Sequence, residues 1–508
     1  MVNKVTTATV IGLDAYNVSV ETDVLNGIPA FSIVGLPDTA INEARDRVRS
    51  AIKNSGFTFP AKKVVINLAP ADLKKEGSNF DLPIAVGLLV EEEVLSEEKL
   101  KDFAFIGELS LDGSLRGVTG VLPLILGLKA HGIKNVFVPK INASEAALAG
   151  DINVFGANCL CDVVNHFADS KITPTTIDIQ NYLEEGAKQD YLYDVKGQQK
   201  AKKALEIAAG GGHNMLMIGS PGSGKTLMAK CFASILPPLE LQEALELTKI
   251  YSISGLLSPD EPLMTKRPFR AVHHTASANG IIGGGTMPKP GEITLAHRGV
   301  LFLDEMVEFP RNVLEVLRQP LEDGEIVISR AKHSIKYPAK FMLLGAMNPC
   351  PCGYLGDKQK QCTCSEFQIS RYQSRLSGPL LDRIDLQVEV PRLTSDELLN
   401  IEPATESSAD IRKRVIKARK IQAERYKNDG ILTNSELTSK LIKKYCQIDV
   451  QSAALLKTAI VKYQLSGRRY DRILKLARTI ADLDNSENIK QIHLMQALQY
   501  RMSNSQSN

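Results

Sequence analysis

The sequence predicts an α/β protein with two α/β domains followed by a helical domain. Three observations support this prediction: short apolar runs alternate with amphipathic segments over residues 1–392, these runs end at glycine, proline or acidic residues, and the pattern becomes helical from residue 393. At about 150 residues per domain, 508 residues are enough for two to four domains. We place domains at 1–170, 194–392 and 393–502, with a polar linker at 171–193 and a disordered tail at 503–508.

The charge balance and hydropathy limit the classes of function. The chain has 61 basic and 58 acidic residues, a net charge of +3, so a nucleic-acid site must be a local patch. Its longest apolar stretch, residues 82–90, is far shorter than the roughly 20 residues of a membrane-spanning helix. The N-terminus has no apolar signal-peptide core. We therefore expect a cytoplasmic protein with no membrane partner and no structural disulfides.

Short periodic segments predict the outer elements. β-Branched apolar runs predict strands at 62–70, 135–139 and 152–156, and helical spacing before a glycine predicts a helix at 42–56. In the last domain, helical spacing predicts helices at 411–427, 435–465, 468–483 and 489–501. The first of these carries eight basic residues, which form a solvated helix face, a track for phosphates or an interface with an acidic subunit. Its predicted buried face consists of Ile411, Val415, Ala418 and Gln422.

Residues 219–226 read GSPGSGKT and fit the pattern G-x-x-x-x-G-K-[ST] at every position. The apolar run at 214–218 predicts a strand before this loop, and LMAKCFASIL predicts a helix after it. Such a loop lets backbone N–H groups surround phosphate oxygens at the N-terminus of a helix. We expect Lys225 to contact the β- and γ-phosphates of ATP and Thr226 to bind Mg²⁺. The other residues of the loop are Gly219, Ser220, Pro221, Gly222, Ser223 and Gly224.

A second strand ends in two carboxylates. In VLFLDE at 300–305, four apolar residues precede Asp304 and Glu305, as at the carboxyl end of a buried parallel strand. We expect Asp304 to hold the Mg²⁺ and Glu305 to polarise the attacking water. The apolar run at 340–349 contains Asn348 near its end, and a neutral amide there would orient the water without adding charge.

At these residues the sequence resembles an AAA+ ATPase of the magnesium-chelatase-like group, and most closely the ComM (YifB) family. The resemblance rests on DVKGQQKAKKALEIAAGGGHNMLMIGSPGSGKT, FRAVHHTASANGIIGGGTMPKPGEITLAHRGVLFLDE and RYQSRLSGPLLDRID, and it covers nearly the whole chain. It implies a homo-oligomeric ring, usually a hexamer, with ATP bound between neighbouring subunits. It also implies a ring helicase that drives branch migration of DNA in natural transformation, together with recombination proteins.

The same resemblance assigns roles to three further residues. It implies that Asn348 is the first sensor, that Arg383 of LLDRID is the arginine finger acting on the ATP of the next subunit, and that Arg468 is the second sensor. A cation supplied by a neighbour neutralises charge in the transition state. The alternative for Arg383 is a surface ion pair with Asp382 or Asp385.

Two insertions carry basic residues. The stretch 273–298, with three glycines at 283–285, resembles the loop that this clade inserts before its acidic strand. EIVISRAKHSIKYP at 325–338 alternates apolar and polar residues about a turn near Ala331, which predicts a hairpin. Basic side chains there either contact DNA phosphates in the channel of a ring or decorate a solvated tip. These residues are Lys289, Arg330 and Lys332.

Residues 62–139 resemble the proteolytic domain of Lon, mainly in NLAPADLKKEGSNFDLPIAVGLL and GELSLDGSLRG. Lon uses a Ser–Lys dyad, in which the lysine activates the hydroxyl. The alignment places Asn79 at the nucleophile and Leu122 at the lysine, and although Ser78 is adjacent, no lysine lies near Leu122. We predict a domain that is proteolytically inactive and is reused for binding or ring stacking.

CPCGYLGDKQKQCTC places four cysteines in two C-x-C pairs, Cys350 with Cys352 and Cys362 with Cys364. Four thiolates suit a tetrahedral structural Zn²⁺, while free thiols and a redox pair are the alternatives. Because the cluster directly follows Asn348, we expect loss of the metal to disturb the ATP site.

The sequence favours an ATP-driven DNA ring motor. The alternatives are a metal-chelatase motor subunit that remodels a protein partner, a Lon-like ATP-dependent protease and a nucleotide-gated scaffold. The missing lysine argues against the protease, and Glu305 argues against a scaffold that needs no hydrolysis. The Lon-like domain and the cysteine cluster favour the DNA motor over the chelatase subunit.

Overall fold

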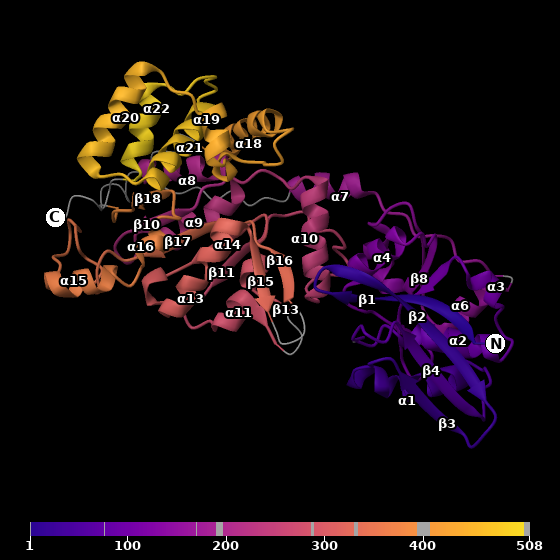
Figure 1. Ribbon diagram of the computed structural model, residues 1–508. Coiled ribbons are helices and arrows are strands. Elements are labelled where there is room, and N and C mark those ends of the chain that lie inside the picture. Colours follow the sequence, from indigo (N-terminus) through magenta and orange to yellow (C-terminus); the bar gives the residue numbers. More distant parts are fainter. Residues whose placement is uncertain are drawn as a thin grey trace. The chain divides into compact units, whose positions relative to one another are not determined.

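A computed structural model describes residues 2–75, 77–168, 170–188, 197–285, 289–329, 334–393 and 407–501 (Figure 1). The chain forms two compact units. The first contains Met1–Glu185 and Glu240–Thr265, and the second contains Gly186–Leu239 and Lys266–Asn508. Each unit combines a sheet with helices, and the second has a parallel sheet and a helical C-terminal part, so the predicted α/β class is confirmed.

The first unit is built on a seven-stranded sheet with the order β3-β4-β2-β1-β5-β8-β9. β2 is antiparallel to both of its neighbours, β1 and β4. β3 is parallel to β4, and β5, β8 and β9 continue the sheet in parallel from β1. Apolar side chains from the sheet and from α1 and α2 form one core. The strands are β1 (Asn3–Ile11), β2 (Asp14–Leu25), β3 (Ala30–Val34), β4 (Lys63–Ala69), β5 (Phe103–Phe105), β8 (Asn135–Pro139) and β9 (Asn153–Ala157), with the short pair β6 (Glu108–Leu109) and β7 (Leu115–Arg116).

Strands and helices largely alternate in this part of the chain, as the sequence predicts, although α3 follows α2 and α7 follows α6. The expected helix at 42–56 is α1, which starts at the Asp38 cap and ends before Gly56, a residue with φ of +83°. The predicted linker 171–193 contains α7, and its residues 189–193 lie outside the described residues. The helices are α1 (Thr39–Asn54), α2 (Asp81–Glu91), α3 (Glu97–Leu100), α4 (Val121–Ala130), α5 (Ala143–Ala147), α6 (Leu160–Phe167) and α7 (Ile179–Lys188).

Helix α10 (Leu241–Ile253) belongs to the first unit although it follows the GSPGSGKT motif in the sequence. It packs against α4, where the backbone N–H of Gly120 donates to the carbonyl of Ser252 at 3.1 Å. The Ser252 hydroxyl donates to the buried carboxylate of Glu145. That carboxylate also accepts the N–H of Leu122 at 2.9 Å. The sequence did not predict this placement, because helical spacing shows that a face is buried but not which partner buries it.

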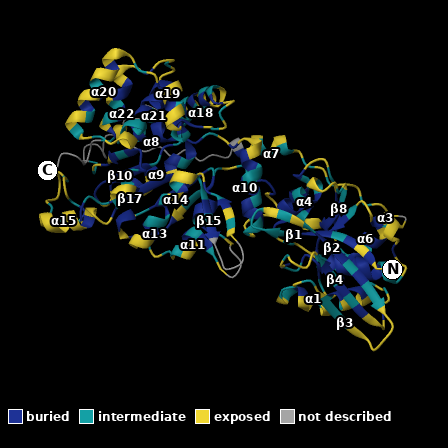
Figure 2. Cartoon of the chain, viewed as in Figure 1, coloured by how far each residue is buried: buried dark blue, intermediate teal, exposed yellow. Residues whose placement is uncertain are grey.

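The second unit is built on five parallel strands in the order β11-β14-β17-β10-β18. The strands predicted at 214–218, 300–305 and 340–349 are β10 (Met215–Ile218), β14 (Val300–Leu303) and β17 (Met342–Met347), and all their residues are buried (Figure 2). Because the carboxyl ends of parallel strands meet at one edge, the residues that follow these strands lie together. The remaining elements of this layer are α8 (Gln199–Gly211), α9 (Lys225–Ser234), β11 (Phe269–Val272), α11 (Ala278–Ile282), α12 (Glu292–Leu295), α13 (Arg311–Val316), α14 (Arg318–Asp323), α15 (Glu366–Gln373), α16 (Gly378–Leu381) and β18 (Leu386–Glu389).

The C-terminal part is helical, as predicted. The predicted buried face of α18, formed by Ile411, Val415, Ala418 and Gln422, is confirmed, and α18 packs against α8. The segment 435–465 holds two helices rather than one, because Asp449 caps a new helix by accepting the N–H of Ser452 at 2.7 Å. The predicted tail at 503–508 lies outside the described residues. The helices are α18 (Ser408–Arg425), α19 (Ser439–Tyr445), α20 (Val450–Tyr463), α21 (Gly467–Leu483) and α22 (Gln491–Gln499).

Two small antiparallel ribbons lie side by side in the second unit (Figure 1). One pairs β12 (Gly283–Gly284) with β13 (Lys289–Pro290), and the other pairs β15 (Glu325–Ser329) with β16 (Ser334–Pro338), as the alternation at 325–338 predicts. A Cβ on Gly283 would lie 2.3 Å from the carbonyl oxygen of Lys289 and 3.0 Å from Cδ1 of Ile328, so the two ribbons touch there. Among the described helices, none combines the length and apolar character that crossing a membrane requires.

Candidate functional site

The loop that follows β10 has the geometry of a phosphate-binding loop. The N–H of Gly219 donates to the carbonyl of Met347 at 3.1 Å, which joins the loop to β17. Gly222 and Gly224 have φ values of +77° and +89°, a backbone conformation that favours glycine. Helix α9 begins at Lys225, so its unpaired N–H groups and its positive end face the loop. An anion fits this position.

The Lys225 side chain is folded back onto the loop. Its Nζ donates to the carbonyls of Gly219 at 2.8 Å and Ser220 at 3.0 Å, and it lies 3.4 Å from Oδ1 of Asn348. Burial lowers the pKa of Lys225, and the negative charges of the two carboxylates after β14 oppose this shift. The fold thus brings together a lysine and an amide that are 123 positions apart.

Thr226 and Asp304 are in direct contact. The Thr226 hydroxyl donates to Oδ2 of Asp304 at 2.8 Å, and Oδ1 of the same carboxylate accepts the N–H of Glu305 at 2.9 Å. A hydroxyl and a carboxylate beside a phosphate loop are ligands that Mg²⁺ takes in nucleotide sites. The chemistry of these donors therefore fits a Mg²⁺–nucleotide complex.

Glu305 is held by a histidine that the sequence analysis missed. Nδ1 of His274 lies 3.4 Å from Oε2 of Glu305, and the ring of His273 lies against that of His274, tilted by 33°, with 4.1 Å between the ring centroids. Glu305 has φ of +49°, which is uncommon for a residue with a side chain. The sequence signal for this contact was the pair of histidines that follows β11. Because β11 and β14 are parallel neighbours, the residues that follow the two strands lie at the same edge of the sheet.

Arg383 is buried in an ion pair within its own chain. Its Nη1 donates to the carbonyl of Pro379 at 2.8 Å, and its Nη2 donates to the carboxylate of Glu322 on α14. Arg383 is 8% exposed, whereas the Glu322 side chain is 52% exposed. The ion-pair alternative therefore describes its present contact, but the partner is Glu322 and not a neighbouring aspartate.

The aspartates on either side of that arginine bind the first turns of α21. Nε of Arg469 lies 3.2 Å from Oδ1 of Asp382, and Nη1 of Arg472 lies 2.6 Å from Oδ1 of the buried Asp385. Arg468 precedes them on the same helix and is exposed. The LLDRID segment therefore fixes the start of the helix that carries Arg468.

The candidate DNA contacts are only partly described. Lys289 is exposed on β13, whereas Arg330 and Lys332 lie outside the described residues.

On α18 the predicted basic surface divides into two sets. Arg414 binds Glu206 of α8 and Arg425 binds Asp482 of α21, so these cations hold α18 to those two helices. The exposed cations of this helix are Lys413, Lys417 and Lys420.

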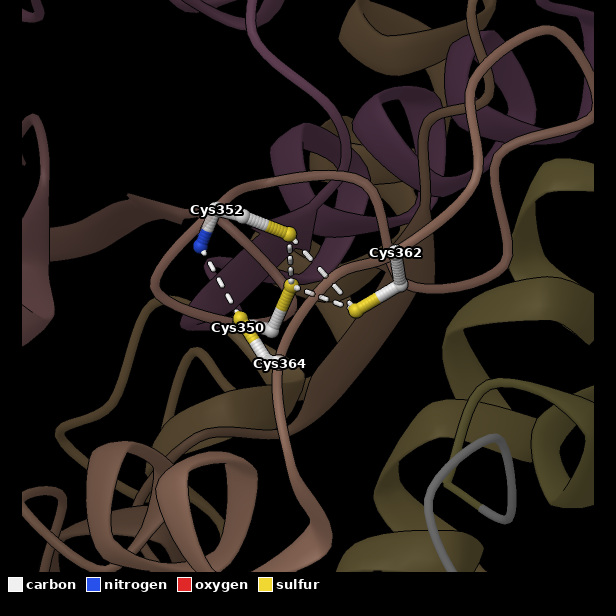
Figure 3. Close-up of side chains that lie close together, drawn as sticks. All are labelled: Cys350, Cys352, Cys362 and Cys364. Carbon is white, nitrogen blue, oxygen red and sulfur yellow. Dashed lines mark hydrogen bonds between the residues drawn. The ribbon is translucent and has the colours of Figure 1, made fainter.

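Figure 3 shows the four cysteines of the C-x-C pairs facing one another. Sγ of Cys350 lies 3.4 Å from that of Cys352 and 3.7 Å from that of Cys362, and the last two are 3.6 Å apart. Sγ of Cys364 accepts the N–H of Cys352 at 3.4 Å. Backbone N–H groups lower the pKa of Cys352 to about 5, whereas burial raises the pKa of Cys350. All four sulfur atoms lie within 4.8 Å of one another.

In the first unit, the residues aligned with a Ser–Lys dyad have structural contacts. Asn79 is buried and its Nδ2 donates to the carbonyl of Ala8 at 3.1 Å. The Ser78 hydroxyl donates to a carboxylate, that of Glu108. Leu122 is fully buried in α4.

Three family models match the chain. The model described as magnesium chelatase, subunit ChlI, matches residues 191–398, the one described as subunit ChlI of Mg-chelatase matches residues 20–142, and the model of the ChlI C-terminal region matches residues 405–501. Together with the parallel sheet and the loop at 219–226, they define the class of protein: a magnesium-chelatase-like AAA+ protein.

Relatives of nearly equal length refine this class. The competence protein ComM of Haemophilus influenzae is 46% identical over 496 residues, which are 96% of this chain and 95% of that protein. The protein YifB of Salmonella typhimurium is 44% identical over 497 residues, 97% of this chain and 96% of that protein. The chain therefore belongs to the ComM/YifB family. The 38 kDa magnesium-chelatase subunit of Rhodobacter capsulatus is more distant, at 28% identity over 39% of this chain and 54% of that protein.

Proposed function

We propose that the protein is an ATP-driven ring motor on DNA, a helicase or translocase that promotes branch migration and DNA integration in natural transformation and recombination. The observation that carries this proposal is the 46% identity to the competence protein ComM over 96% of the chain. The nucleotide site supports the proposal that ATP is the energy source. The two ribbons of the second unit support the proposal that the protein contacts DNA. Such a motor works in the cytoplasm with recombination proteins as partners.

In this proposal the loop after β10 binds ATP together with Mg²⁺. Hydrolysis of the ATP supplies the energy for movement. The Lys225 side chain turns from the loop carbonyls to the β- and γ-phosphates, whose negative charge pairs with its ammonium group. Thr226 and Asp304, already in contact, hold the Mg²⁺. Glu305 polarises the attacking water, and Asn348, which lies beside Lys225, orients it.

We infer a head-to-tail homo-oligomer, a hexameric ring, in which neighbours complete each site. Arg383 of one subunit acts on the ATP of the next, which requires it to leave Glu322. Arg468 contacts the phosphates of its own subunit as the lid closes. The lid helix that carries Arg468 is tied to the segment that carries Arg383, so nucleotide binding in one site moves the finger of another.

The two ribbons supply the contact with DNA. They touch at Gly283 and Ile328, so the two ribbons lie next to each other. Lys289 is exposed on β13, and Arg330 and Lys332 belong to the turn between β15 and β16 in the sequence. Cations of this kind bind phosphates without reading bases, which suits a motor that moves along any sequence.

The proposal assigns roles to the remaining parts. Residues 194–392 form the ATPase core and 393–502 its helical lid. The domain at 1–170 binds or stacks in the ring and is proteolytically inactive, because Ser78 contacts a carboxylate and Leu122 takes the lysine position. The four cysteines bind one structural Zn²⁺, which their mutual distances support.

The second candidate is a protein-remodelling motor of the metal-chelatase type without DNA activity. The family models described as chelatase subunit ChlI favour it. The chelatase subunit of Rhodobacter capsulatus matches only 39% of this chain, whereas ComM matches nearly all of it. We therefore prefer the DNA motor.

The test is ATP hydrolysis with and without single-stranded, duplex and four-way-junction DNA at two salt concentrations. We expect strong stimulation that falls with salt, because phosphate contacts release counterions. The triple variant Lys289→Ala, Arg330→Ala, Lys332→Ala should lose this stimulation. The triple variant Lys413→Ala, Lys417→Ala, Lys420→Ala removes as many cations from α18 and should retain it. No stimulation by any DNA would favour the protein-remodelling motor.

A further inference from the structure

The four-cysteine cluster has the dimensions of a zinc site. Zinc binds thiolates at about 2.3 Å in a tetrahedron, which places the sulfur atoms about 3.8 Å apart. Three sulfur–sulfur distances here are 3.4, 3.6 and 3.7 Å, and all four sulfur atoms lie within 4.8 Å of one another. All four cysteines are free thiols. The geometry therefore favours a four-thiolate metal site over a redox pair.

Backbone N–H groups surround the sulfur atoms. The N–H of Cys352 donates to Sγ of Cys364 at 3.4 Å. The N–H groups of Thr363 and Tyr354 lower the pKa of Cys352, and the N–H of Gly353 donates to the backbone carbonyl of Cys350 at 2.9 Å, which shapes the turn between the first two cysteines. Such donors orient thiolates for a metal and offset part of their charge.

The segment between the two C-x-C pairs, residues 350–364, lies against the phosphate loop. Gly353 has φ of +85°, and a Cβ there would lie 2.6 Å from Cδ of Pro221, so the backbone of the cysteine loop contacts the phosphate loop directly. Nη2 of Arg392 donates to the carbonyl of Pro221 at 3.2 Å. The guanidinium of the same arginine lies 5.9 Å from the ring centroid of Tyr354.

A second contact joins the two loops at Asp357. Oδ1 of Asp357 accepts the N–H of Gln359 at 2.7 Å, and this bond together with the nearby hydroxyl of Ser220 in the phosphate loop lowers the pKa of Asp357. Nε2 of Gln359 donates to the carbonyl of Leu393 at 3.2 Å, which fixes the far side of the cysteine loop. Ser220 is also one of the two residues whose carbonyls bind Lys225. The cysteine loop therefore reaches the residues that position the phosphate-binding lysine.

We propose that a Zn²⁺ bound by Cys350, Cys352, Cys362 and Cys364 holds the cysteine loop against residues 219–221, so that nucleotide affinity depends on zinc. Without the metal, a 15-residue segment loses its cross-link and gains conformational freedom, and the phosphate loop loses the surface that Pro221 packs on. The cysteines touch no nucleotide and are positioning residues. The inference rests on the proposed nucleotide site and adds its dependence on a second metal.

The first experiment uses the full-length protein. Zinc content is measured by elemental mass spectrometry, and the affinity for a fluorescent ADP analogue is measured with Mg²⁺ before chelation, after chelation and after zinc is restored. We expect about one zinc per chain, and an affinity that falls about tenfold or more on chelation and recovers with zinc. Far less than one zinc per chain would overturn the metal site. Unchanged affinity after zinc loss would overturn the coupling.

Paired cysteine variants control for the loss of thiols. Cys362→Ser with Cys364→Ser should remove the zinc and weaken nucleotide binding. Cys159→Ser with Cys161→Ser changes a C-x-C pair of the first unit and should leave both unaltered. Zinc retained in the first double variant would contradict the assigned ligands.

Paired glycine variants test the loop contact with the zinc in place. Gly353 and Gly356 lie in the same loop with φ values of +85° and +77°, so alanine is strained equally at both. Only the Cβ at position 353 meets Pro221, because a Cβ at position 356 has nothing within 4 Å. Gly353→Ala should keep its zinc and lose affinity, whereas Gly356→Ala should keep both. Equal losses in the two variants would overturn the contact as the cause.

These binding measurements need no DNA. A failure of the DNA-motor proposal can therefore be distinguished from a failure of the zinc inference. Zinc-dependent ADP affinity without stimulation by DNA would remove the DNA motor and support this inference. If Lys225→Ala binds ADP as tightly as the wild type, both the nucleotide site and its zinc dependence are overturned.

Discussion

The guanidinium of Arg383 is held by the carboxylate of Glu322 in the same chain. Glu322 lies on α14, the helix that directly precedes β15 and packs against it. The residue that holds Arg383 therefore lies on the helix that packs against the β15–β16 ribbon. In a ring whose subunits complete each other's sites, this ion pair competes with the neighbour's ATP for the arginine.

Glu322→Gln should raise ATP turnover in the absence of DNA by up to about fivefold, because a partly exposed ion pair contributes about 1 kcal/mol or less. The measurement is steady-state hydrolysis as a function of protein concentration. Glu436→Gln removes the carboxylate of another exposed pair of the same unit, that with Lys340, and should have no effect. Turnover that is unchanged or lower in Glu322→Gln would show that the pair does not restrain Arg383.

Arg383→Ala should abolish hydrolysis while nucleotide binding in each subunit is retained, because in the proposed ring this arginine acts on the ATP of a neighbour. A mixing experiment tests this directly. Lys225→Ala subunits lack nucleotide binding but carry Arg383, and Arg383→Ala subunits have the opposite defect. Mixed rings should regain part of the activity that each variant lacks alone. No recovery on mixing would place the action of Arg383 within its own subunit.

Glu305→Gln should keep ATP bound and slow its hydrolysis by about 100-fold or more, because it removes the group that polarises the water. His274→Ala should also slow hydrolysis, by about tenfold or more, since Nδ1 of His274 lies 3.4 Å from the Glu305 carboxylate and positions it. His273→Ala is the comparison variant: its Nδ1 contacts Thr275 and its ring contacts His274, so it should slow hydrolysis less than His274→Ala. Equal turnover in the two histidine variants would remove His274 from this role.

The N-terminal domain should not cleave casein with or without ATP. The Ser78 hydroxyl contacts the carboxylate of Glu108, and the position aligned with the activating lysine is the buried Leu122, which has no amine. The assay compares the wild type with Ser78→Ala. Cleavage that is present in the wild type and lost in this variant would contradict the prediction.

The parts of the fold that could be predicted depend on local signals. Buried parallel strands read as continuous apolar runs, and the phosphate loop has fixed glycine positions, so β10, β14 and β17 and their end residues follow from the sequence. The pair Arg383–Glu322 and the docking of α10 on α4 join segments far apart in the chain. Patterns of spacing carry no information about such partners. His274 is an intermediate case. The apolar pattern of the strand before it can be read from the sequence, but its contact with Glu305 can be inferred only once the order of the strands in the sheet is known.

Acidification should weaken the packing between lid and core through His213. This side chain is buried, with Nε2 2.7 Å from the hydroxyl of Thr479 and Nδ1 3.2 Å from Oδ2 of Asp385. Burial lowers the pKa of His213, although the charge of Asp385 opposes the shift. The unfolded chain binds a proton at about pH 6.5, whereas the folded chain resists it, so stability present above that pH is lost as the pH falls below it. The drop in thermal midpoint between pH 7.5 and pH 5.5 should be smaller in His213→Gln than in the wild type. The drop should be the same as in the wild type in the control His131→Gln, which alters an exposed histidine. An equal drop in all three proteins would show that His213 does not set this dependence.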